Sequence, residues 1–502
     1  MTHYDHVVVG SGSAGAVVAS RLAESGKRVA LFETGLSDEN NEKVLDLTKW
    51  SDLLGTETDY DYKIEPQQRG NSLIRYSRGK VLGGCSSHNS CIAFYTPDYD
   101  LLEWVKLGAV GWDPTTVKPY FEKVRSKVNF ESAQIDNPFI KDVFNAANSA
   151  GYPTIEFNKR DNNKTGIGWF DLNKRGNIRE SSSVAYLHPL SQWGDRIHFF
   201  LNTKVTKIII KNKRAIGVQT SQGSFYANGE VIICCGAIDT PKLLLLSGIG
   251  PHDHLKTIGI PTILNARGVG SHLLDHPEGV LNWELNCPMP KEFINYWEVG
   301  LFDKTSPDLG DPDIMMHLGI IIFDMNTKLY GYPTATHGFS LTPNVTRARS
   351  EGTIRLQSTN PDDNPLIDFK YFTDPYDERI IVSGFKRARE IASQPALSKW
   401  IKRELTPGPN VKTDEEISDY IRKTSNTVYH AAGSCKMGHI YDPLAVVDHE
   451  LRVYGIANLR IADSSIFPTM IGVNPNITIM MIGERCADFI IRTNKIRMRA
   501  KI

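Results

Sequence analysis

The sequence lacks the segments that carry a protein into or across a membrane. No run in its 502 residues approaches the roughly 18 apolar residues that a membrane-spanning helix needs. The opening residues, MTHYDHVVVGSG, have no charged, apolar and cleavage regions of a secretory signal and lead almost directly into a strand pattern. These absences predict a cytoplasmic protein without a membrane partner.

An excess of either charge is also missing. Lys and Arg number 57, and so do Asp and Glu, which argues against a general attraction to nucleic acid or to anionic lipid. Cysteine is scarce: the seven residues, an odd number spread from Cys85 to Cys486, suit a reducing compartment better than a disulfide framework. No repeat of 20–50 residues appears, which excludes a repeat array.

The first 35 residues contain a dinucleotide-binding pattern. An apolar, β-branched run at residues 5–9 is followed by Gly10-x-Gly12-x-x-Gly15, an apolar-faced helix and a second strand that ends at Glu33. Glycines at these positions permit a tight turn, close approach to a pyrophosphate and helix–strand packing, while an acid at this distance binds ribose hydroxyls. FAD and NAD share the pattern, so it leaves the choice of cofactor open.

The rest of the chain predicts insertions into this fold. Residues 100–150 have helical spacing, the segment from Arg196 to Ala237 alternates strand and turn signals like an antiparallel meander, and residues 285–424 mix strands with helices. We therefore predict an α/β protein with a Rossmann-type nucleotide-binding domain and an interleaved α+β substrate-binding domain. The first would comprise residues 1–150, 190–285 and 425–502, and the second residues 151–189 and 286–424.

Four separated blocks carry a resemblance to a known family. They are the glycine pattern with Glu33, RGKVLGGCSSHN, GAIDTPKLLLLSGIGP, and YHAAGSCKMG with LRIADSSIFPTMIGVNPN. Together they resemble the glucose–methanol–choline (GMC) oxidoreductases, FAD-dependent alcohol oxidases and dehydrogenases. GGCSSHNSCIAF, GFSLTPNV and VNPNITIMMIGERCAD are most similar to its choline-oxidising members.

The resemblance implies a reaction and its participants. A primary alcohol would pass a hydride to flavin N5, and O2 would reoxidise the flavin to give H2O2. The substrate would be choline, oxidised to betaine aldehyde by a homodimer, with further oxidation to glycine betaine left open. The cofactor contacts that it implies are Gly10, Gly12, Ser13, Ala14, Gly15, Glu33, Gly83, Gly84, Ser87, His88, Asn89, Val205, Asp463, Asn474 and Pro475.

The segment VLGGCSSHNSC, residues 81–91, is expected to run along the flavin ring, where larger side chains would clash. A metal site fails on ligand count, because Cys85, His88 and Cys91 give three candidates with no second cluster nearby. The resemblance implies a covalent bond from His88 to the 8α-methyl carbon of the flavin. The alternative is a histidine that only stacks near a dissociable flavin.

The resemblance also implies the catalytic groups. His430 and Asn474 would converge on the reactive carbon, and only the histidine can take a proton, which favours His430 as the base. His337 would be the second histidine, positioning the alkoxide. The alternatives are a turn-capping role for His430, a turn-forming Asn-Pro at Asn474 and a structural loop histidine at 337.

A choline site needs aromatic faces and a carboxylate. The resemblance assigns Trp50 and Tyr429 to the faces and Glu298 to the carboxylate, and it sets Ser90 on the substrate side of the flavin. Glu298 stands in apolar, aromatic surroundings where an unpaired carboxylate is costly, so the alternative is a salt bridge to Arg or Lys. Val428 matches an apolar group near the oxygen-reacting carbon and favours an oxidase over a dehydrogenase.

Two departures leave the substrate open. Ser51 replaces a bulkier apolar residue, and His317 stands where another aromatic box residue is expected. A looser, more polar box would suit a related amino alcohol or a larger quaternary alcohol. A dehydrogenase with another acceptor and a flavin protein without turnover are further alternatives. The last is disfavoured by the presence of the full set His430, Asn474, His337 and Glu298.

Overall fold

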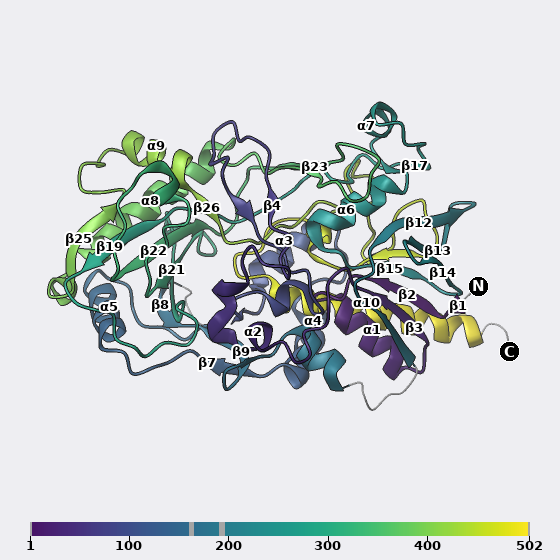
Figure 1. Cartoon of the computed structure of the whole chain (residues 1–502), viewed down its shortest axis with the longest axis horizontal. Coiled ribbons are helices and arrows are strands. Elements are labelled where there is room, and N and C mark those ends of the chain that lie inside the picture. Colours follow the sequence, from purple (N-terminus) through teal and green to yellow (C-terminus); the bar gives the residue numbers. More distant parts are fainter. Residues whose placement is uncertain (1–2, 160–164, 190–195, 500–502) are drawn as a thin grey trace.

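The structure, a computed structural model, describes residues 3–159, 165–189 and 196–499. A parallel sheet and a large antiparallel sheet lie toward opposite ends of the long axis (Figure 1). Both termini lie at the end that carries the parallel sheet (Figure 1).

The parallel sheet is built around the N-terminal glycine pattern. Its strand order is β11 (Ile197–Phe200), β3 (Val29–Phe32), β2 (His6–Val9), β15 (Val231–Ile233) and β27 (Leu459–Ile461). All neighbouring pairs are parallel, and β2, β3 and β15 are buried along their whole length, which explains their continuous apolar runs. Helices α1 (Gly15–Glu24) and α10 (Asn476–Arg499) pack against each other beside this sheet (Figure 1).

The predicted meander forms only in part. Strands β12 (Val205–Lys211), β13 (Arg214–Thr220) and β14 (Gly223–Ala227) are antiparallel, and β1 (His3–Tyr4) joins β14. Strand β11 instead pairs with β3 of the parallel sheet. Helices α6 (Gly236–Leu246) and α7 (His252–Thr257) follow, with β16 (Ile249–Gly250) and β17 (Leu264–Asn265).

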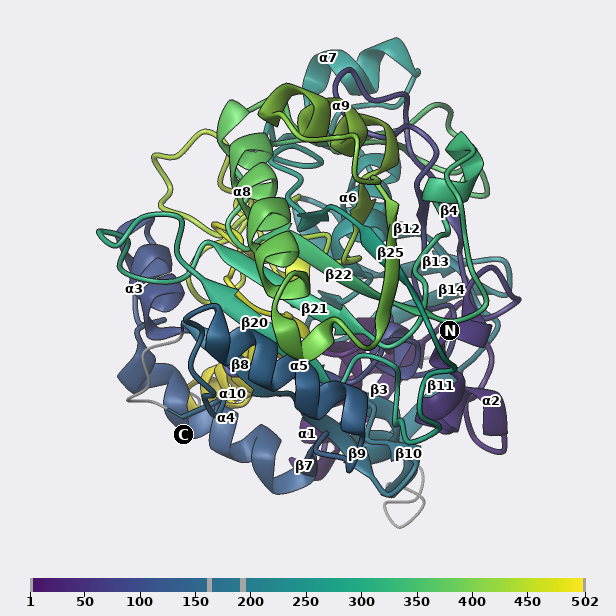
Figure 2. The same ribbon diagram turned by 90° about the vertical axis from the view of Figure 1, so that its left-hand side faces the viewer.

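The large antiparallel sheet supplies one wall of the candidate site. Its order is β25 (Ile401–Thr406), β19 (Leu281–Leu285), β22 (Gly338–Val345), β21 (Ile314–Gly319), β20 (Val299–Asp303) and β8 (Gly166–Trp169), with β18 (Pro277–Glu278) and β26 (Asn426–Thr427) beside it. Helices α8 (Pro375–Ala392) and α5 (Pro138–Ser149) lie across the face seen in Figure 2, near α9 (Asp414–Thr424). The opposite face is therefore available to the nucleotide-binding side.

Smaller elements connect these parts. They are α2 (Glu42–Leu45), α3 (Asp98–Lys106), α4 (Pro114–Lys127), β4 (Tyr62–Lys63), β5 (Arg75–Tyr76), β6 (Ile92–Ala93), β7 (Phe130–Ser132), β9 (Asp171–Arg175), β10 (Ile178–Arg179), β23 (Thr353–Arg355) and β24 (Leu366–Asp368). Short 3₁₀ or π turns occur at Leu47–Leu53, Gly84–Ser87, Ser183–Leu187, Thr327–Tyr330, Pro395–Leu397 and Ser464–Ile466.

The predicted fold class is confirmed: a Rossmann-type α/β unit is combined with an α+β unit assembled from separated segments. The domain boundaries stay a prediction. Strands β18, β19 and β26 pair within the antiparallel sheet, although the predicted division groups them with the nucleotide-binding segments. In the described part of the chain, no helix has the length and apolarity to cross a membrane.

Candidate active site

A cleft opens at the carboxyl ends of β2, β3 and β15, as the glycine pattern predicts. Gly10 has φ +92°, and a Cβ there would lie 2.4 Å from the carbonyl oxygen of Cys234. A Cβ on Gly15 would lie 1.9 Å from the carbonyl oxygen of Gly10. Both positions therefore require glycine. The predicted residues that line this cleft are Gly10, Gly12, Ser13, Ala14, Glu33, Gly84, Val205 and Asp463.

Two carboxylates at the cleft are each held by hydrogen bonds from protein donors. Glu33 accepts hydrogen bonds from the backbone N–H and hydroxyl of Ser11, at 3.1 and 2.7 Å, and from Gly35 N–H at 2.9 Å. Burial raises its pKa, and the bound donors hold it at the cleft edge where a ribose would lie. The Asp463 carboxylate is likewise held by protein donors, including the Thr240 hydroxyl at 2.6 Å.

A second cavity continues from this cleft. The two share Ser13, Arg78, Gly79, Cys85, Ser464 and Ile479, so they form one long slot. The second cavity brings together most of the predicted reaction residues: His88, Asn89, Ser90, Trp50, Val428, Tyr429, His430, Asn474 and Pro475.

Gly83 and Ser87 are not among the residues that line either cavity. Gly83 has φ +85°, and a Cβ there would lie 2.1 Å from the Ser87 hydroxyl oxygen. That hydroxyl donates to the carbonyl oxygen of Leu82 at 2.7 Å. Both residues thus shape the turn that presents His88, rather than contacting the slot.

His88 is held in place by weak contacts at both ring nitrogens. Its Nε2 lies 3.3 Å from the carbonyl oxygen of Leu53, and its Nδ1 lies 3.4 Å from the Ser77 hydroxyl oxygen. Burial lowers its pKa to about 4. The ring is therefore neutral at pH 7 where it lines the slot.

His430 and Asn474 converge as predicted, and a third group joins them. Asn474 Nδ2 lies 3.5 Å from His430 Nε2. On the other side of the ring, His430 Nδ1 lies 2.8 Å from Nδ1 of His276, while the backbone N–H of His430 donates to Asp275 at 2.9 Å. The residues 275 and 276, which come from the stretch LLDHPEG, were not predicted to take part.

The structure does not bring His337 to this cavity. Its side chain is exposed, and it lines a separate hollow beside Met289, Phe293 and Tyr296. His317 of β21 lines the slot instead and is buried, and its Nδ1 lies 3.4 Å from Asn344 Nδ2. The prediction for His337 is thus corrected: the segment before β22 runs outside the slot, and β21 places His317 there instead.

Comparison with known proteins agrees with this geometry. Two models described as GMC oxidoreductase match residues 4–278 and 348–483. The chain belongs to the GMC oxidoreductase family. It is 46% identical to choline oxidase of Arthrobacter globiformis over 97% of this chain and 94% of that protein. It is 32% identical to mitochondrial choline dehydrogenase of Mus musculus, over 97% of this chain and 89% of that protein. Pyridoxine 4-oxidase from Mesorbium loti superimposes with a TM-score of 0.89 at 26% identity, over 96% of this chain and 98% of that one.

The GMC family oxidises alcohols with FAD, and the slot fits that cofactor. The glycine-lined cleft and Glu33 suit the adenosine diphosphate half, next to the N-terminus of α1. In the other half, Thr342 Oγ1, Asn474 Oδ1 and Asn476 Nδ2 are buried atoms of lining residues without a hydrogen-bond partner among the described residues. Such atoms call for a ligand or water partner.

The predicted substrate-binding role of Glu298 is corrected, because this buried carboxylate is not among the residues that line the slot. Its Oε1 accepts hydrogen bonds from the backbone N–H groups of Ile294, Asn295 and Tyr296 at 2.7–3.0 Å. Its Oε2 has no hydrogen-bond partner among the described residues. The side chain is fully buried, and burial raises its pKa despite those three donors. The alternative of a salt bridge to Arg or Lys finds no support in the described part of the chain.

Glu278 is a second carboxyl group that sequence reasoning missed. It lies on β18, lines the slot and is buried, and Asn426 Nδ2 donates to it at 3.2 Å. Burial raises its pKa to about 8, so it is largely protonated at pH 7. The available signal was the run Asp-His-Pro-Glu at 275–278, where chemically active residues sit between apolar segments.

The buried histidines predict acid sensitivity. Burial lowers the pKa of His317 to about 3, so below about pH 6.5 the unfolded chain takes up a proton there that the folded chain refuses. The contribution of His317 to the free energy of unfolding is therefore greatest above about pH 6.5. Acidification below that pH lowers the free energy of unfolding by about 1.4 kcal/mol per pH unit through this residue. Denaturant titrations of wild type and His317→Gln between pH 7 and 4.5 measure this contribution, because the difference between the two free energies of unfolding cancels the other titrating groups. Parallel pH curves for the two proteins would contradict this account.

Proposed function

We propose that this GMC oxidoreductase oxidises choline, or a closely related quaternary amino alcohol, to the aldehyde with O2 as acceptor and H2O2 as product. The single observation that carries the proposal is Glu278, a buried carboxyl group that lines the slot beside Trp297 and Tyr429 and has no cation partner among the described residues. A substrate with a permanent positive charge would supply that partner. The 46% identity to a protein named choline oxidase supports the same substrate class.

Aromatic rings around the slot support binding of a quaternary ammonium group. Trp50, Trp297, Phe323 and Tyr429 line it, and Trp50 Nε1 donates to the Asn295 carbonyl at 2.9 Å, which fixes its ring. Ring faces attract cations most strongly where water is excluded. Two of these rings, Trp297 and Phe323, offset the more polar character that His317 gives the box.

His430 and Asn474 are the groups that would contact the hydroxyl of the substrate. A substrate hydroxyl placed between them can donate its proton to His430 Nε2 and accept a hydrogen bond from Asn474 Nδ2. His317 accepts at Nδ1 from Asn344, so its Nε2 carries a proton that can be donated to the alkoxide. FAD, when bound, supplies the acceptor for the hydride that leaves the alcohol carbon.

A panel of alcohols tests the proposal. Choline, other amino alcohols and neutral primary alcohols are each offered to the purified flavoprotein, with oxygen uptake and peroxide formation followed together. The proposal expects the highest kcat/KM for choline or another quaternary amino alcohol, with peroxide matching oxygen consumed. Turnover only with a dye or quinone would favour a dehydrogenase. Bound flavin without turnover of any alcohol would favour a non-catalytic role.

The covalent link is a separate prediction. We expect His88, neutral and buried at the slot, to be joined to the flavin through the ring's 8α-methyl carbon. Acid precipitation followed by centrifugation should therefore leave a yellow pellet for wild type and a colourless one for His88→Asn. A colourless wild-type pellet with free FAD in the supernatant would rule the bond out. The homodimer and the cytoplasmic location also remain predictions.

A further inference from the structure

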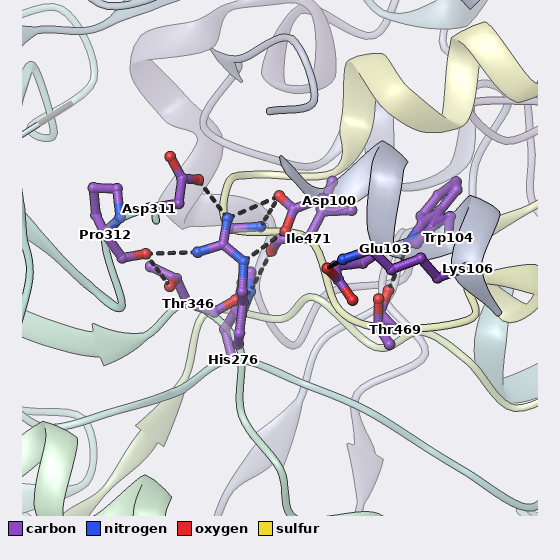
Figure 3. A network of polar contacts seen from close by, with 12 residues as sticks. Asp100, Glu103, Trp104, Lys106, His276, Asp311, Pro312, Thr346, Thr469 and Ile471 are labelled. Carbon is purple, nitrogen blue, oxygen red and sulfur yellow. Dashed lines mark hydrogen bonds and ion pairs between the residues drawn. The ribbon is translucent and has the colours of Figure 1, made fainter. Parts of the chain in front are cut away.

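His276 is bracketed by groups that can only accept hydrogen bonds on one side of its ring. Its Nε2 lies 2.8 Å from the carbonyl oxygen of Thr346 and 2.9 Å from that of Ile471 (Figure 3). Carbonyl oxygens have no proton to give, so Nε2 must carry one. The side chain is 2% exposed, and burial lowers its pKa to about 4. A neutral imidazole has one N–H, so Nδ1 of His276 is left as an acceptor.

This assignment fixes the proton on His430. The two Nδ1 atoms are 2.8 Å apart, and since that of His276 accepts, that of His430 must donate. Because the one proton of the neutral His430 ring is on Nδ1, the ring presents a lone pair at Nε2. Asn474 Nδ2, a donor 3.5 Å away, faces that lone pair. With the opposite tautomer of His430, the lone pairs of the two Nδ1 atoms would face each other at 2.8 Å. The Nε2–H of His430 would also face the Nδ2 donor of Asn474.

We propose that His276 is a positioning residue that holds His430 in the Nδ1–H tautomer, so that Nε2 is free to accept the proton of the substrate hydroxyl. The consequence for catalysis rests on the proposed alcohol oxidation, whereas the tautomer itself does not. His276 lies outside the family's motif blocks, and its contact with His430 joins positions 154 residues apart.

A buried ionic network keeps the two carbonyl groups in place. Arg347, next to Thr346 at the end of β22, pairs with Asp100 at 2.5 Å and Asp311 at 2.6 Å. The same Asp100 accepts from the backbone N–H of Gly472 at 2.8 Å, next to Ile471. One carboxylate on α3 thus ties both acceptor segments together, and Asp100 and Asp311 lie on either side of this network in Figure 3. The segments that carry both acceptor carbonyls are therefore connected through Asp100.

The tautomer can be read directly. Long-range ¹H–¹⁵N spectra of the holoenzyme with ¹⁵N-labelled histidine distinguish protonated from unprotonated ring nitrogens, and His430→Gln assigns the His430 signals. We expect a protonated Nδ1 and an unprotonated Nε2 on His430. A proton on Nε2 would overturn the inference whether or not any alcohol is turned over.

Two variants test the consequence. His276→Leu removes the acceptor, and kcat should fall by about 10²- to 10⁴-fold with KM changed less than about threefold. His276→Asn keeps an acceptor oxygen near the place of Nδ1, and it should recover at least about tenfold of that loss. Wild-type kcat and an unchanged His430 spectrum in His276→Leu would overturn the inference. Should His276→Leu fail to bind flavin or fold, the wild-type and His276→Asn spectra decide. If the wild type oxidised no alcohol, the proposed function would be overturned, but the assigned tautomer of His430 would not.

Discussion

Replacing His430 by alanine is expected to lower kcat by about 10²- to 10⁴-fold while the flavin stays bound. The ring lies between Asn474 and His276 in the slot, where its Nε2 can reach a substrate hydroxyl. Alanine removes the proton acceptor but leaves untouched the glycine cleft, Glu33 and His88 that would hold the cofactor. Steady-state kinetics and the flavin absorbance of the purified variant measure the two quantities.

His337→Ala is the matched control for that experiment. Both histidines were predicted to serve catalysis, but His337 is exposed in a separate hollow. We expect its variant to keep kcat within about twofold of wild type, in line with an exposed substitution away from the site. Near-normal turnover of His430→Ala would contradict its assignment, and a large loss in His337→Ala would contradict the correction made from the structure.

Glu278→Gln is expected to lower kcat/KM for choline by about 30- to 3,000-fold, the range for removing one partner of a buried charge pair. Glutamine keeps an oxygen that can accept the hydrogen bond from Asn426, so the local structure stays in place. What it removes is the negative charge, which a cation bound in the slot would favour at Glu278 although burial alone raises its pKa to about 8. The neutral isostere 3,3-dimethylbutan-1-ol, which lacks the cation, should change by less than about threefold.

Glu298→Gln provides the comparison, because this buried carboxylate lies outside the slot. Glutamine keeps an oxygen that can accept the three N–H groups of Ile294, Asn295 and Tyr296. The choline preference should therefore change far less than in Glu278→Gln. Equal losses for choline and the neutral alcohol in Glu278→Gln would mean that Glu278 is structural.

Local patterns predicted the residues whose roles depend on neighbours in sequence. Gly10, Gly15 and Glu33 follow from the strand–turn–helix pattern, whereas the role of His88 was implied by the family resemblance. Likewise the parallel sheet could be anticipated, because its strands are short, apolar and buried on both faces. The order of the antiparallel sheet could not, since it interleaves strands from residues 166 to 406.

The choice between His317 and His337 shows where sequence reasoning ends. All six residues of β21 are buried, so no alternation of polar and apolar residues marks which side chains face the slot. His276 is harder still, because its acceptors lie 70 and 195 positions away and are backbone carbonyls, which carry no sequence signal. Both depend on tertiary contacts alone.

A single-turnover experiment tests the proposed reaction most directly. The purified holoenzyme is mixed with choline without oxygen while the flavin absorbance is followed, and air is then admitted and peroxide is measured. The account predicts loss of the oxidised flavin band on mixing with choline, then recovery of the band with about one peroxide per flavin reduced. A band that choline leaves unchanged, while a neutral primary alcohol bleaches it, would contradict the account.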